Sequence, residues 1–342
     1  MADLNLDALG SADVKQQVER FRATHAAIVQ EVRRIIVGQN DVLEQVLIAL
    51  FVGGHCLITG LPGTAKTLLV RTIANTLGLE FRRIQFTPDL MPTDITGTDI
   101  IGEDPATGRR TWTFVPGPIF GNIVLADEIN RTPPKTQSAL LEAMQERSCT
   151  VRGNMYTLPS PFFVLATQNP IELEGTYPLP EAQLDRFLFN TKLDYLTSDQ
   201  ELQVLGLTTT NHSDPVRAVT NAEEIIAFQR LVRMVPAAES VARYALSLVR
   251  GTRPSDAFAS DIVKKYVNFG SSVRGAQFLM LAAKTRALIH DRYHVTYEDV
   301  RSLAIPVLRH RVLLNFHAES DRLDSDYVLT KMIEAVPVPK GD

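Results

Sequence analysis

The stretch that decides the fold is Gly60-Leu61-Pro62-Gly63-Thr64-Ala65-Lys66-Thr67. It matches the phosphate-binding loop (P-loop) pattern, except that Ala65 replaces the glycine before the lysine. The run His55–Thr59 predicts a strand before it, and Lys66–Leu77 predicts a helix after it, capped by Gly78. Backbone N–H groups of such a loop, at a helix N-terminus, can bind phosphate oxygens. The alternative is an ordinary turn of glycine and proline before a helix.

The positions of this loop have different expected tasks. Lys66 would reach the β- and γ-phosphates, and the Thr67 hydroxyl would coordinate Mg²⁺. Gly60 and Gly63 would carry the tight-turn geometry, whereas Ala65 is expected to begin the helix with right-handed backbone angles that tolerate a Cβ. The residues of this stretch that are expected to bind the nucleotide are Gly60, Pro62, Gly63, Thr64, Ala65, Lys66, Thr67 and Leu68.

A second apolar run, Ile123–Ala126, ends in the acidic pair Asp127 and Glu128. Asp127 would hold Mg²⁺ through water, and Glu128 would orient and polarise an attacking water. The alternative is a strand that happens to end in two solvated acids, which is common. The P-loop upstream favours the catalytic interpretation.

A third apolar run, Phe162–Thr167, is followed by Gln168, Asn169 and Pro170. The amide of Asn169 at the end of a strand can hold the attacking water and a γ-phosphate oxygen. The alternative is a simple turn, since asparagine before proline is very common there. After a P-loop and an acidic strand end, we favour the sensor role.

Strands alternating with helical stretches, with a further strand predicted at Phe81–Phe86, indicate a parallel α/β sheet in the first part of the chain. Beyond Tyr195 only helical patterns remain, so we expect a second, all-helical domain. Its helical stretches are Ala222–Met234, Ala237–Val249, Gly275–Ile289 and Tyr297–Leu303. The expected division is a loose arm or short helix at residues 1–20, an α/β core at 21–195 that begins with the helix Phe21–Ile36, and a helical domain at 196–342.

Composition narrows the class of protein. A length of 342 residues predicts about two domains, and a net charge of −4 gives no global basic field for binding nucleic acid. The two cysteines, Cys56 and Cys149, form no disulfide framework, and the histidines lack the spacing of zinc ligands, so we expect no zinc site. No apolar run has the length of a signal peptide or membrane span. A soluble, cytoplasmic protein is expected.

Together the P-loop, the acidic strand end and Asn169 resemble an AAA+ ATPase. Longer strings narrow the resemblance to the MoxR family, from about Ile36 to Tyr195 and again, weakly, at Leu308–Arg311. These strings are Ile84–Leu90, Pro116–Phe120, Asp127–Arg131, Pro133–Met144, Ala166–Pro170 and Glu174–Phe187. The resemblance implies an AAA+ core with hairpin inserts, followed by a helical lid domain.

The resemblance also assigns residues. Arg186 matches an arginine that reaches the nucleotide of the neighbouring subunit, although a surface pair between Asp185 and Arg186 is the alternative. Arg274 matches a second sensor arginine, with Val273 standing where the family usually has proline. Whether Arg274 acts on its own or a neighbouring nucleotide is left open. The stretch around Val37 and Gly38 resembles one that contacts adenine, and it also fits a glycine-capped helix end.

Two hairpins are implied as well. Ile95–Val115 fits an insert with its turn at Asp104–Gly108, and Cys149–Leu158 fits a second hairpin with its turn at Gly153–Asn154. Trp112, the only tryptophan, is expected to pack within the first hairpin. Such hairpins commonly face the central channel of a ring, where they could touch a client protein.

The implied function is ATP hydrolysis with Mg²⁺ by a homo-oligomeric ring, expected to be a hexamer. Its catalytic residues would be Glu128, Asn169, Arg186 and Arg274. The ring would act as a chaperone on a separate partner protein, often one with a von Willebrand factor A domain.

Two alternatives remain. A nucleic-acid motor would need basic hairpins, but these offer only Arg152 in the second hairpin, and Arg109 and Arg110 opposed by Glu103 and Asp104 in the first. A scaffold that binds ATP but barely hydrolyses it is disfavoured by the full catalytic set.

Overall fold

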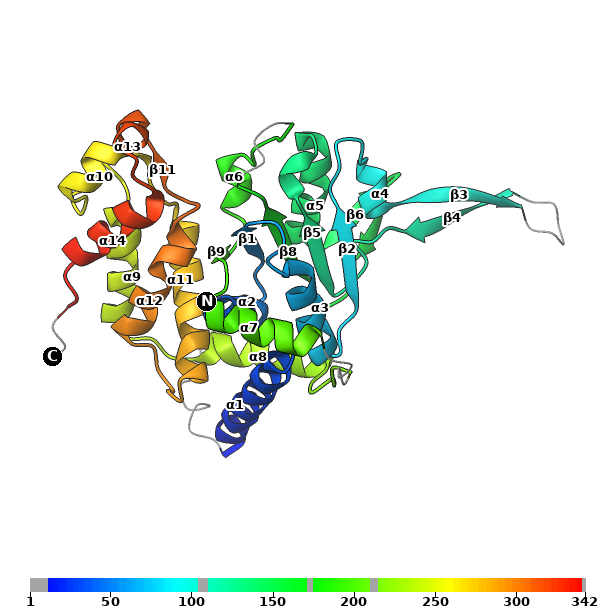
Figure 1. Ribbon diagram of the computed structural model, residues 1–342, viewed down its shortest axis with the longest axis horizontal. Coiled ribbons are helices and arrows are strands. Elements are labelled where there is room, and N and C mark those ends of the chain that lie inside the picture. The colour runs from blue at the N-terminus through cyan, green and yellow to red at the C-terminus, as the bar shows by residue number, and fades with distance from the viewer. Residues whose placement is uncertain (1–11, 104–109, 171–174, 210–214, 340–342) are drawn as a thin grey trace.

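The computed structural model describes residues 12–103, 110–170, 175–209 and 215–339. A sheet flanked by helices forms one part, a bundle of helices lies beside it, and a long hairpin projects on the opposite side (Figure 1). No helix in the described ranges is long and apolar enough to cross a membrane.

The central sheet has five strands, and every neighbouring pair is parallel. Their order across the sheet is β2 (Phe81–Gln85), β5 (Ile123–Asp127), β8 (Phe163–Gln168), β1 (Cys56–Gly60) and β9 (Phe189–Leu193). This confirms the predicted parallel α/β sheet and adds β9, which the sequence analysis did not predict. Because the strands are parallel, their carboxyl ends meet at one edge of the sheet.

Alternate residues of the strands face two apolar clusters, one on each side of the sheet. Cys56 and Ile58 of β1 belong to the first cluster, and Leu57 between them belongs to the second. The first side is covered by α1 (Ala12–Arg33), α2 (Asn40–Val52) and α3 (Lys66–Thr76). The second is covered by α4 (Pro92–Thr96) and α5 (Pro134–Glu146). Three further elements are η2 (Ile129–Arg131), α6 (Glu181–Leu184) and α7 (Ser198–Thr208).

The first helix starts earlier than expected. It begins at Ala12 rather than Phe21, so of the two expected alternatives, a loose arm or a short helix, residues 12–20 are helical and continue into the predicted helix. Val14, Val18 and Phe21 are all buried, because their spacing of four and three residues places them on one face of the helix. Residues 1–11 of the expected arm lie outside the described part of the chain.

The second part of the chain is largely helical, as predicted. Its helices are α8 (Ala222–Met234), α9 (Glu239–Gly251), α10 (Asp261–Tyr266), α11 (Val273–Ile289), α12 (Tyr297–Leu308), α13 (Phe316–Ser320) and α14 (Ser325–Ala335). The prediction that it is all-helical is wrong in one detail, because β10 (Val267–Phe269) and β11 (Leu313–Leu314) form a short antiparallel pair. These strands carry too few residues to produce a recognisable alternating pattern.

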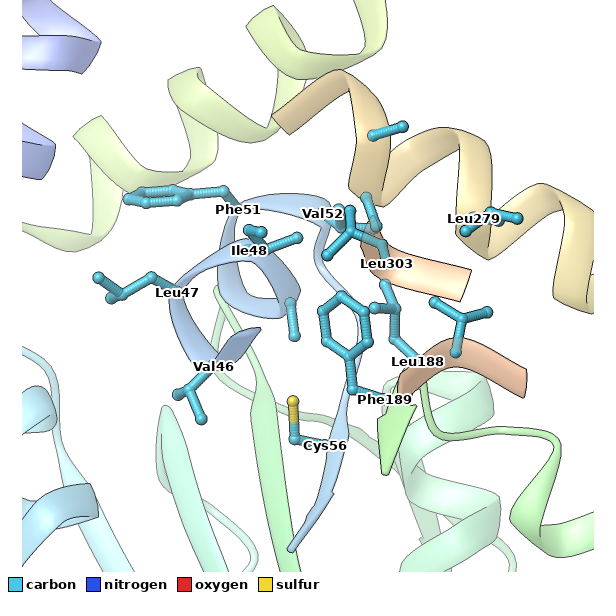
Figure 2. Packing of buried hydrophobic residues seen from close by; sticks show 14 of the residues in the cluster. Val46, Leu47, Ile48, Phe51, Val52, Cys56, Leu188, Phe189, Leu279 and Leu303 are labelled. Atoms are coloured by element: carbon cyan, nitrogen blue, oxygen red, sulfur yellow. The ribbon is translucent and has the colours of Figure 1, made fainter. Parts of the chain in front are cut away.

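An apolar seam joins the helical part to the sheet. The helix α2 is buried along most of its length, and it packs between the sheet and the helices behind it. Figure 2 shows Val52 of α2 beside Leu303 of α12, with Leu279 of α11 farther along the same side and Phe189 of β9 between Val52 and the sheet, while Phe51 points to the other side of α2. All of these residues belong to one continuous buried cluster.

Two antiparallel hairpins lie at the far side of the sheet. β3 (Gly97–Glu103) pairs with β4 (Arg110–Pro116), and β6 (Ser148–Val151) pairs with β7 (Asn154–Thr157). The predicted turn Asp104–Gly108 lies outside the described residues. The second turn is formed by Arg152 and Gly153, with φ of 48° and 85°, and not by Gly153–Asn154 as expected. Two consecutive residues with positive φ suit the twist of a two-residue hairpin turn.

Aromatic contacts connect the two hairpins. The rings of Phe114 in β4 and Tyr156 in β7 stack with their centroids 3.9 Å apart. The guanidinium of Arg152 lies 4.1 Å from the ring centroid of Trp112. Trp112 therefore packs against the other hairpin while 57% of it stays exposed.

Candidate nucleotide-binding site

The glycine-rich loop runs from the carboxyl end of β1 to the first residue of α3. A Cβ on Gly60 would lie 2.8 Å from the Cβ and the carbonyl oxygen of Leu193, so the close approach of β9 requires glycine there. Gly63 has φ +80°, which glycine adopts without strain. The first turn of α3 has no acidic residue and no side-chain cap, so its N–H groups face the loop ready to bind an anion.

Ala65 corrects one expectation. It has φ 59° and ψ 27°, which is left-handed, and not the right-handed conformation that we expected at a helix start. Ala65 is the N-cap residue of α3 and lies just outside the helix, where the chain must still turn. A Cβ in this conformation crowds the following carbonyl. The position therefore favours the glycine that the P-loop pattern has there.

We expect Ala65→Gly to raise the free energy of unfolding by up to about 1 kcal/mol, because it relieves left-handed strain. Ala65→Val should lower it by roughly 2 kcal/mol, because a β-branched side chain adds to the crowding. Chemical denaturation of the three proteins measures both effects. A valine variant as stable as the glycine variant would mean that the backbone at residue 65 is not left-handed.

The Lys66 ammonium lies at the centre of this loop. Its Nζ donates to the carbonyl of Gly60, and the Thr64 hydroxyl donates to the carbonyl of Leu61 at 2.8 Å. Burial lowers the pKa of Lys66, and the carboxylates of Asp127 and Glu128 raise it in part. Those two carboxylates are thus close enough to act on the same charge as the loop.

Asp127 is the last residue of β5 and Glu128 follows it, and Thr167 near the end of β8 connects them. The Thr167 hydroxyl donates to Asp127 Oδ1 at 2.7 Å and accepts from the backbone N–H of Glu128 at 2.8 Å. Arg83 of β2 donates to Asp127 Oδ2 at 2.7 Å. The neighbouring strands therefore fix both acids from two sides.

Glu128 has an uncommon backbone conformation for a residue with a side chain. Its φ is 58° and its ψ is 49°, and such strain often accompanies functional positions. One of its carboxylate oxygens, Oε2, accepts from Gln85 at 3.0 Å and from Arg131 at 3.0 Å. Gln85 of β2 and Arg131 of η2 thus hold the Glu128 carboxylate from two sides.

Asn169 follows β8 at the same edge of the sheet. The register places Gln168 opposite Thr59 of β1, so Asn169 lies level with Gly60, where the P-loop begins. Asn169 is 6% exposed. Asn169 therefore lies at the same edge of the sheet as the P-loop.

The stretch with Val37 and Gly38 lies between α1 and α2, and it also reaches this edge. The Gln39 side chain donates to the carbonyl of Asp194, directly after β9, at 2.9 Å. Leu193 of β9 is the register partner of Gly60. Val37 is buried, and Gly38 has φ +68°, so this turn packs beside the P-loop strand.

Arg186 and Arg274 lie elsewhere. Arg186 precedes β9 at the amino end of the sheet, where Leu188 N donates to the carbonyl of His55 at 2.7 Å. Arg274 is in the first turn of α11, and both arginines line a hollow of about 200 Å³ beside His55. The structure therefore brings these two arginines together and separates them from the P-loop.

The surface pair of Asp185 with Arg186, considered as an alternative, has competing partners. The Asp185 carboxylate lies 3.3 Å from Arg274 Nη1 and 2.8 Å from Arg311 Nε. Arg186 Nη1 instead donates to the carbonyl of Leu141 at 2.6 Å.

Comparison with known proteins identifies the chain. A family model described as "ATPase family associated with various cellular activities (AAA)" matches residues 55–189, and an AAA lid domain model matches residues 259–332. The chaperone MoxR1 of Mycobacterium tuberculosis is 41% identical, over 91% of this chain and 81% of that protein. The chain belongs to the MoxR family of AAA+ ATPases. Protein MoxR of Paracoccus denitrificans is 30% identical, over 94% of this chain and 96% of that protein.

Other relatives of this MoxR-family chain agree. The uncharacterized protein YeaC of Bacillus subtilis is 44% identical, over 91% of this chain and 93% of that protein. A crystal structure of an inferred ATPase from Cytophaga hutchinsonii superposes with a TM-score of 0.89 at 38% identity, covering 96% of this chain and 98% of that one. The AAA+ core and the helical lid expected from the sequence are thus confirmed.

The edge of the sheet where the carboxyl ends of the strands meet, with Lys66, Thr67, Asp127 and Glu128, is called the nucleotide edge below. Its side chains fit ATP and Mg²⁺. An uncapped helix N-terminus and the Lys66 ammonium suit a triphosphate, and the oxygens of Thr67 and Asp127 are of the kind that Mg²⁺ prefers. Among the described residues, no group of three or more His, Cys, Asp and Glu side chains is placed to hold a metal ion.

Several residues of the site were given no role from the sequence. Thr167, Arg83 and Gln85 contact the two acids, and although Gln85 and Thr167 stand in strings that carry the family resemblance, none of the three was assigned a function. Their signal lies in the strand register, because Gln85 pairs with Asp127 across β2 and β5. Arg311 was part of a family-like string without an assigned role.

Proposed function

We propose that this protein is a Mg²⁺-dependent ATPase that works as a ring, expected to be a hexamer, with each ATP bound between two subunits. One observation carries the proposal: Lys66 and Glu128 lie at one edge of the sheet, and Arg186 lies at the other. The five residues of β1 span roughly 16 Å at about 3.3 Å per residue, so Arg186 cannot reach the phosphates of its own P-loop. In a head-to-tail ring, the arginine edge of one subunit faces the nucleotide edge of the next.

The same geometry supports a contact of Arg274 with the neighbouring nucleotide. It lines the same hollow as Arg186 and bonds to Asp185, the residue before Arg186. Two arginines from one subunit would then approach the ATP held by the next. Their planar, permanently charged side chains suit contact with phosphate oxygens.

The chemistry follows from the residues at the nucleotide edge. Glu128 orients and polarises the attacking water, and Asn169 holds that water against the γ-phosphate. Lys66 from one subunit and Arg186 from the next offset the charge that develops on the transferring phosphoryl group. Mg²⁺, when bound by Thr67 and through water by Asp127, supplies further charge neutralisation of the β- and γ-phosphates.

The ring would act as a chaperone that remodels a separate client, as the name of MoxR1 suggests for that relative. The hairpins offer a surface for such contact, because Ile101, Trp112 and Met155 are each more than half exposed. A partner with a von Willebrand factor A domain would be a separate chain. Cys56 and Cys149 are both buried, free thiols, which suits the reducing cytoplasm.

A nucleic-acid motor has less support. Arg152 of the second hairpin lies over the ring of Trp112, and Glu103 pairs in register with Arg110 in the first. Arg109 and Asp104 are outside the described residues. A scaffold that binds ATP without hydrolysing it would give no function to Glu128, Arg186 and Arg274.

We expect Glu128→Gln to bind ATP normally and to stop hydrolysis. The amide keeps the shape of the carboxylate but is a far poorer acceptor for the proton of the water. Steady-state phosphate release measures turnover, and equilibrium binding measures affinity. Because the ATP state should persist, this variant is also suited to capture the client from cell extract.

Glu239→Gln is the matched control, since Glu239 is an exposed carboxylate on α9 that pairs with Arg243. It should leave turnover unchanged. Normal turnover in Glu128→Gln would mean that another residue organises the water. Phosphate release by the unaltered protein at background level would favour the scaffold.

A further inference from the structure

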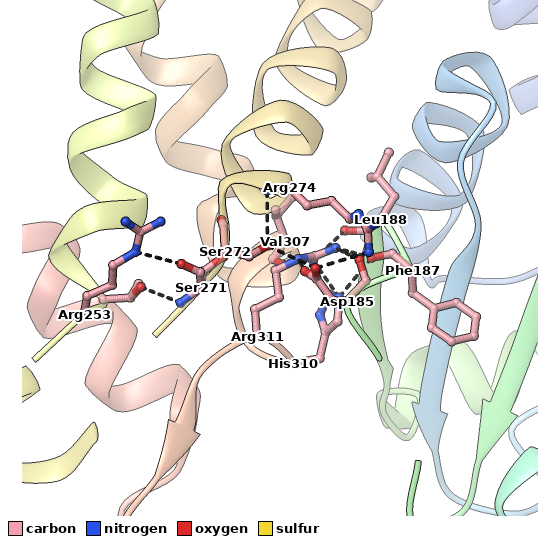
Figure 3. Close-up of polar contacts among 11 residues, drawn as sticks. Asp185, Phe187, Leu188, Arg253, Ser271, Ser272, Arg274, Val307, His310 and Arg311 are labelled. Atoms are coloured by element: carbon pink, nitrogen blue, oxygen red, sulfur yellow. Dashed lines mark hydrogen bonds and ion pairs between the residues drawn. The ribbon is translucent and has the colours of Figure 1, made fainter. Parts of the chain in front are cut away.

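Arg311 lies in the lid, directly after α12, yet its bonds reach into the core. Its side chain is 1% exposed, and its Nε lies 2.8 Å from Asp185 Oδ1. Its Nη2 donates to the carbonyl of Asp185 at 3.0 Å and to that of Phe187, and its Nη1 donates to the carbonyl of Leu188 at 3.3 Å. Figure 3 shows these dashed contacts converging on one guanidinium.

These acceptors surround one residue of the core. Asp185, Phe187 and Leu188 lie on both sides of Arg186, so Arg311 fixes the backbone before and after it. The contact is specific to arginine, because only its planar guanidinium offers five N–H donors in a fixed arrangement. Phe278 of α11 supports the guanidinium from one side, with its ring centroid 5.1 Å away.

The buried charge is compensated. Burial lowers the pKa of Arg311 to about 10, while the Asp185 carboxylate raises it in part, so the guanidinium stays charged at neutral pH. The same carboxylate accepts from the Ser272 hydroxyl at 3.0 Å and from Arg274 Nη1 at 3.3 Å. Asp185 is thus the point where two segments of the lid hold the core loop that carries Arg186.

We propose that Arg311 is a positioning residue that fixes the loop of Arg186. The lid of one subunit then determines where its Arg186 lies relative to the ATP of the next subunit. The inference rests on the proposed role of Arg186 in the neighbouring site. Arg311 itself touches no nucleotide in this arrangement, because its donors are taken by the loop carbonyls, Asp185 and the carbonyl of Val307 in α12.

We expect Arg311→Gln to lower turnover about 10²-fold, the cost of displacing a catalytic group by roughly 1 Å. ATP affinity should stay near normal, because the P-loop lies at the opposite edge of the sheet. Arg311→Lys keeps the buried positive charge opposite Asp185 but cannot bond to all three carbonyls. Its turnover should lie between those of the glutamine variant and the unaltered protein.

Mixed rings separate this role from general damage to the fold. In a mixture of Arg186→Ala and Glu128→Gln subunits, some interfaces combine an intact Glu128 with an intact Arg186, so activity should return. Arg311→Gln mixed with Glu128→Gln should also regain activity, since the defect of each lies on a different side of the interface. Arg311→Gln mixed with Arg186→Ala should stay inactive, because both defects lie on the same side.

Arg309→Gln is the matched control. Arg309 is a lid arginine in the same string that also crosses to the core, but its Nη1 donates to the carbonyl of Asn190 within β9. It should retain most of the turnover. Thermal melting confirms that each variant is folded, and crosslinking confirms that subunits exchange. If Arg311→Gln does not fold, Arg311→Lys is used in the same mixtures, where its partial defect should show the same pattern.

The outcomes distinguish the two proposals. If the mixture of Arg186→Ala with Glu128→Gln stays inactive although subunits exchange, the role of Arg186 in the neighbouring site is wrong and this inference falls with it. If that mixture works but Arg311→Gln regains activity with Arg186→Ala, Arg311 serves its own subunit's nucleotide and only this inference is overturned. Normal turnover in Arg311→Gln overturns it as well.

Discussion

Lys66→Ala should abolish ATP binding at concentrations that saturate the unaltered protein. The Lys66 ammonium is the main side-chain cation beside the uncapped start of α3. Charge-assisted hydrogen bonds contribute about 1.5–3 kcal/mol each, so losing contacts to both the β- and γ-phosphates should weaken binding by roughly 10²-fold or more. Equilibrium binding of a fluorescent ATP analogue measures the change.

Arg71→Ala controls for the loss of a positive charge on the same helix. Arg71 is also on α3, but its guanidinium lies 5.7 Å from the ring centroid of Phe81, away from the P-loop. This variant should bind ATP with nearly unchanged affinity. Affinity within a few-fold of normal in Lys66→Ala would contradict the assignment of the P-loop.

Arg186→Ala should reduce turnover by roughly 10³-fold or more while leaving ATP affinity nearly unchanged. An arginine that stabilises the charge on a transferring phosphoryl group contributes on this scale in related chemistry. Affinity should persist because Arg186 lies at the opposite edge of the sheet from the P-loop of its own subunit. Single-turnover phosphate release at saturating ATP measures the effect on the chemical step.

Arg243→Ala on α9 serves as the control, since Arg243 is an exposed arginine paired with Glu239. Its turnover should match that of the unaltered protein. A loss of turnover in Arg186→Ala that is matched by an equal loss of ATP affinity would instead place Arg186 in its own subunit's binding site.

The nucleotide edge could be predicted because its residues carry local signals. The P-loop, the pair Asp127 and Glu128, and Asn169 each follow an apolar run, and parallel strands must bring such ends together. One short sequence window was enough for each. Whether these residues bind and hydrolyse ATP stays a prediction.

The backbone at Ala65 shows where local reasoning was insufficient. The sequence indicates that a helix begins here, but not whether residue 65 is its first residue or its cap. That choice decides the sign of φ, and it depends on how the loop must turn to aim its N–H groups. The start of α1 was missed for a different reason, because only Val14 and Val18 mark its buried face before Phe21.

The contact of the lid residue Arg311 with Asp185 of the core could not be predicted from the sequence at all. Arg311 and Asp185 are 126 positions apart, and neither stands in a pattern that names the other as its partner. An arginine between His310 and Val312 gives no sign of burial until the chain has folded. Long-range polar pairs of this kind depend on tertiary packing, which a single sequence does not show.

The apolar seam between α2 and the lid resists movement of the lid relative to the core. The sheet, α2 and the lid helices share one apolar cluster, so a hinge between core and lid would have to open that cluster to water. Exposing even roughly 400 Å² of apolar surface would cost about 10 kcal/mol, as much as the whole stability of many domains. In the proposed ring, a force generated at the phosphates would therefore move each subunit as one rigid body against the next, and the interfaces between subunits would be the flexible joints.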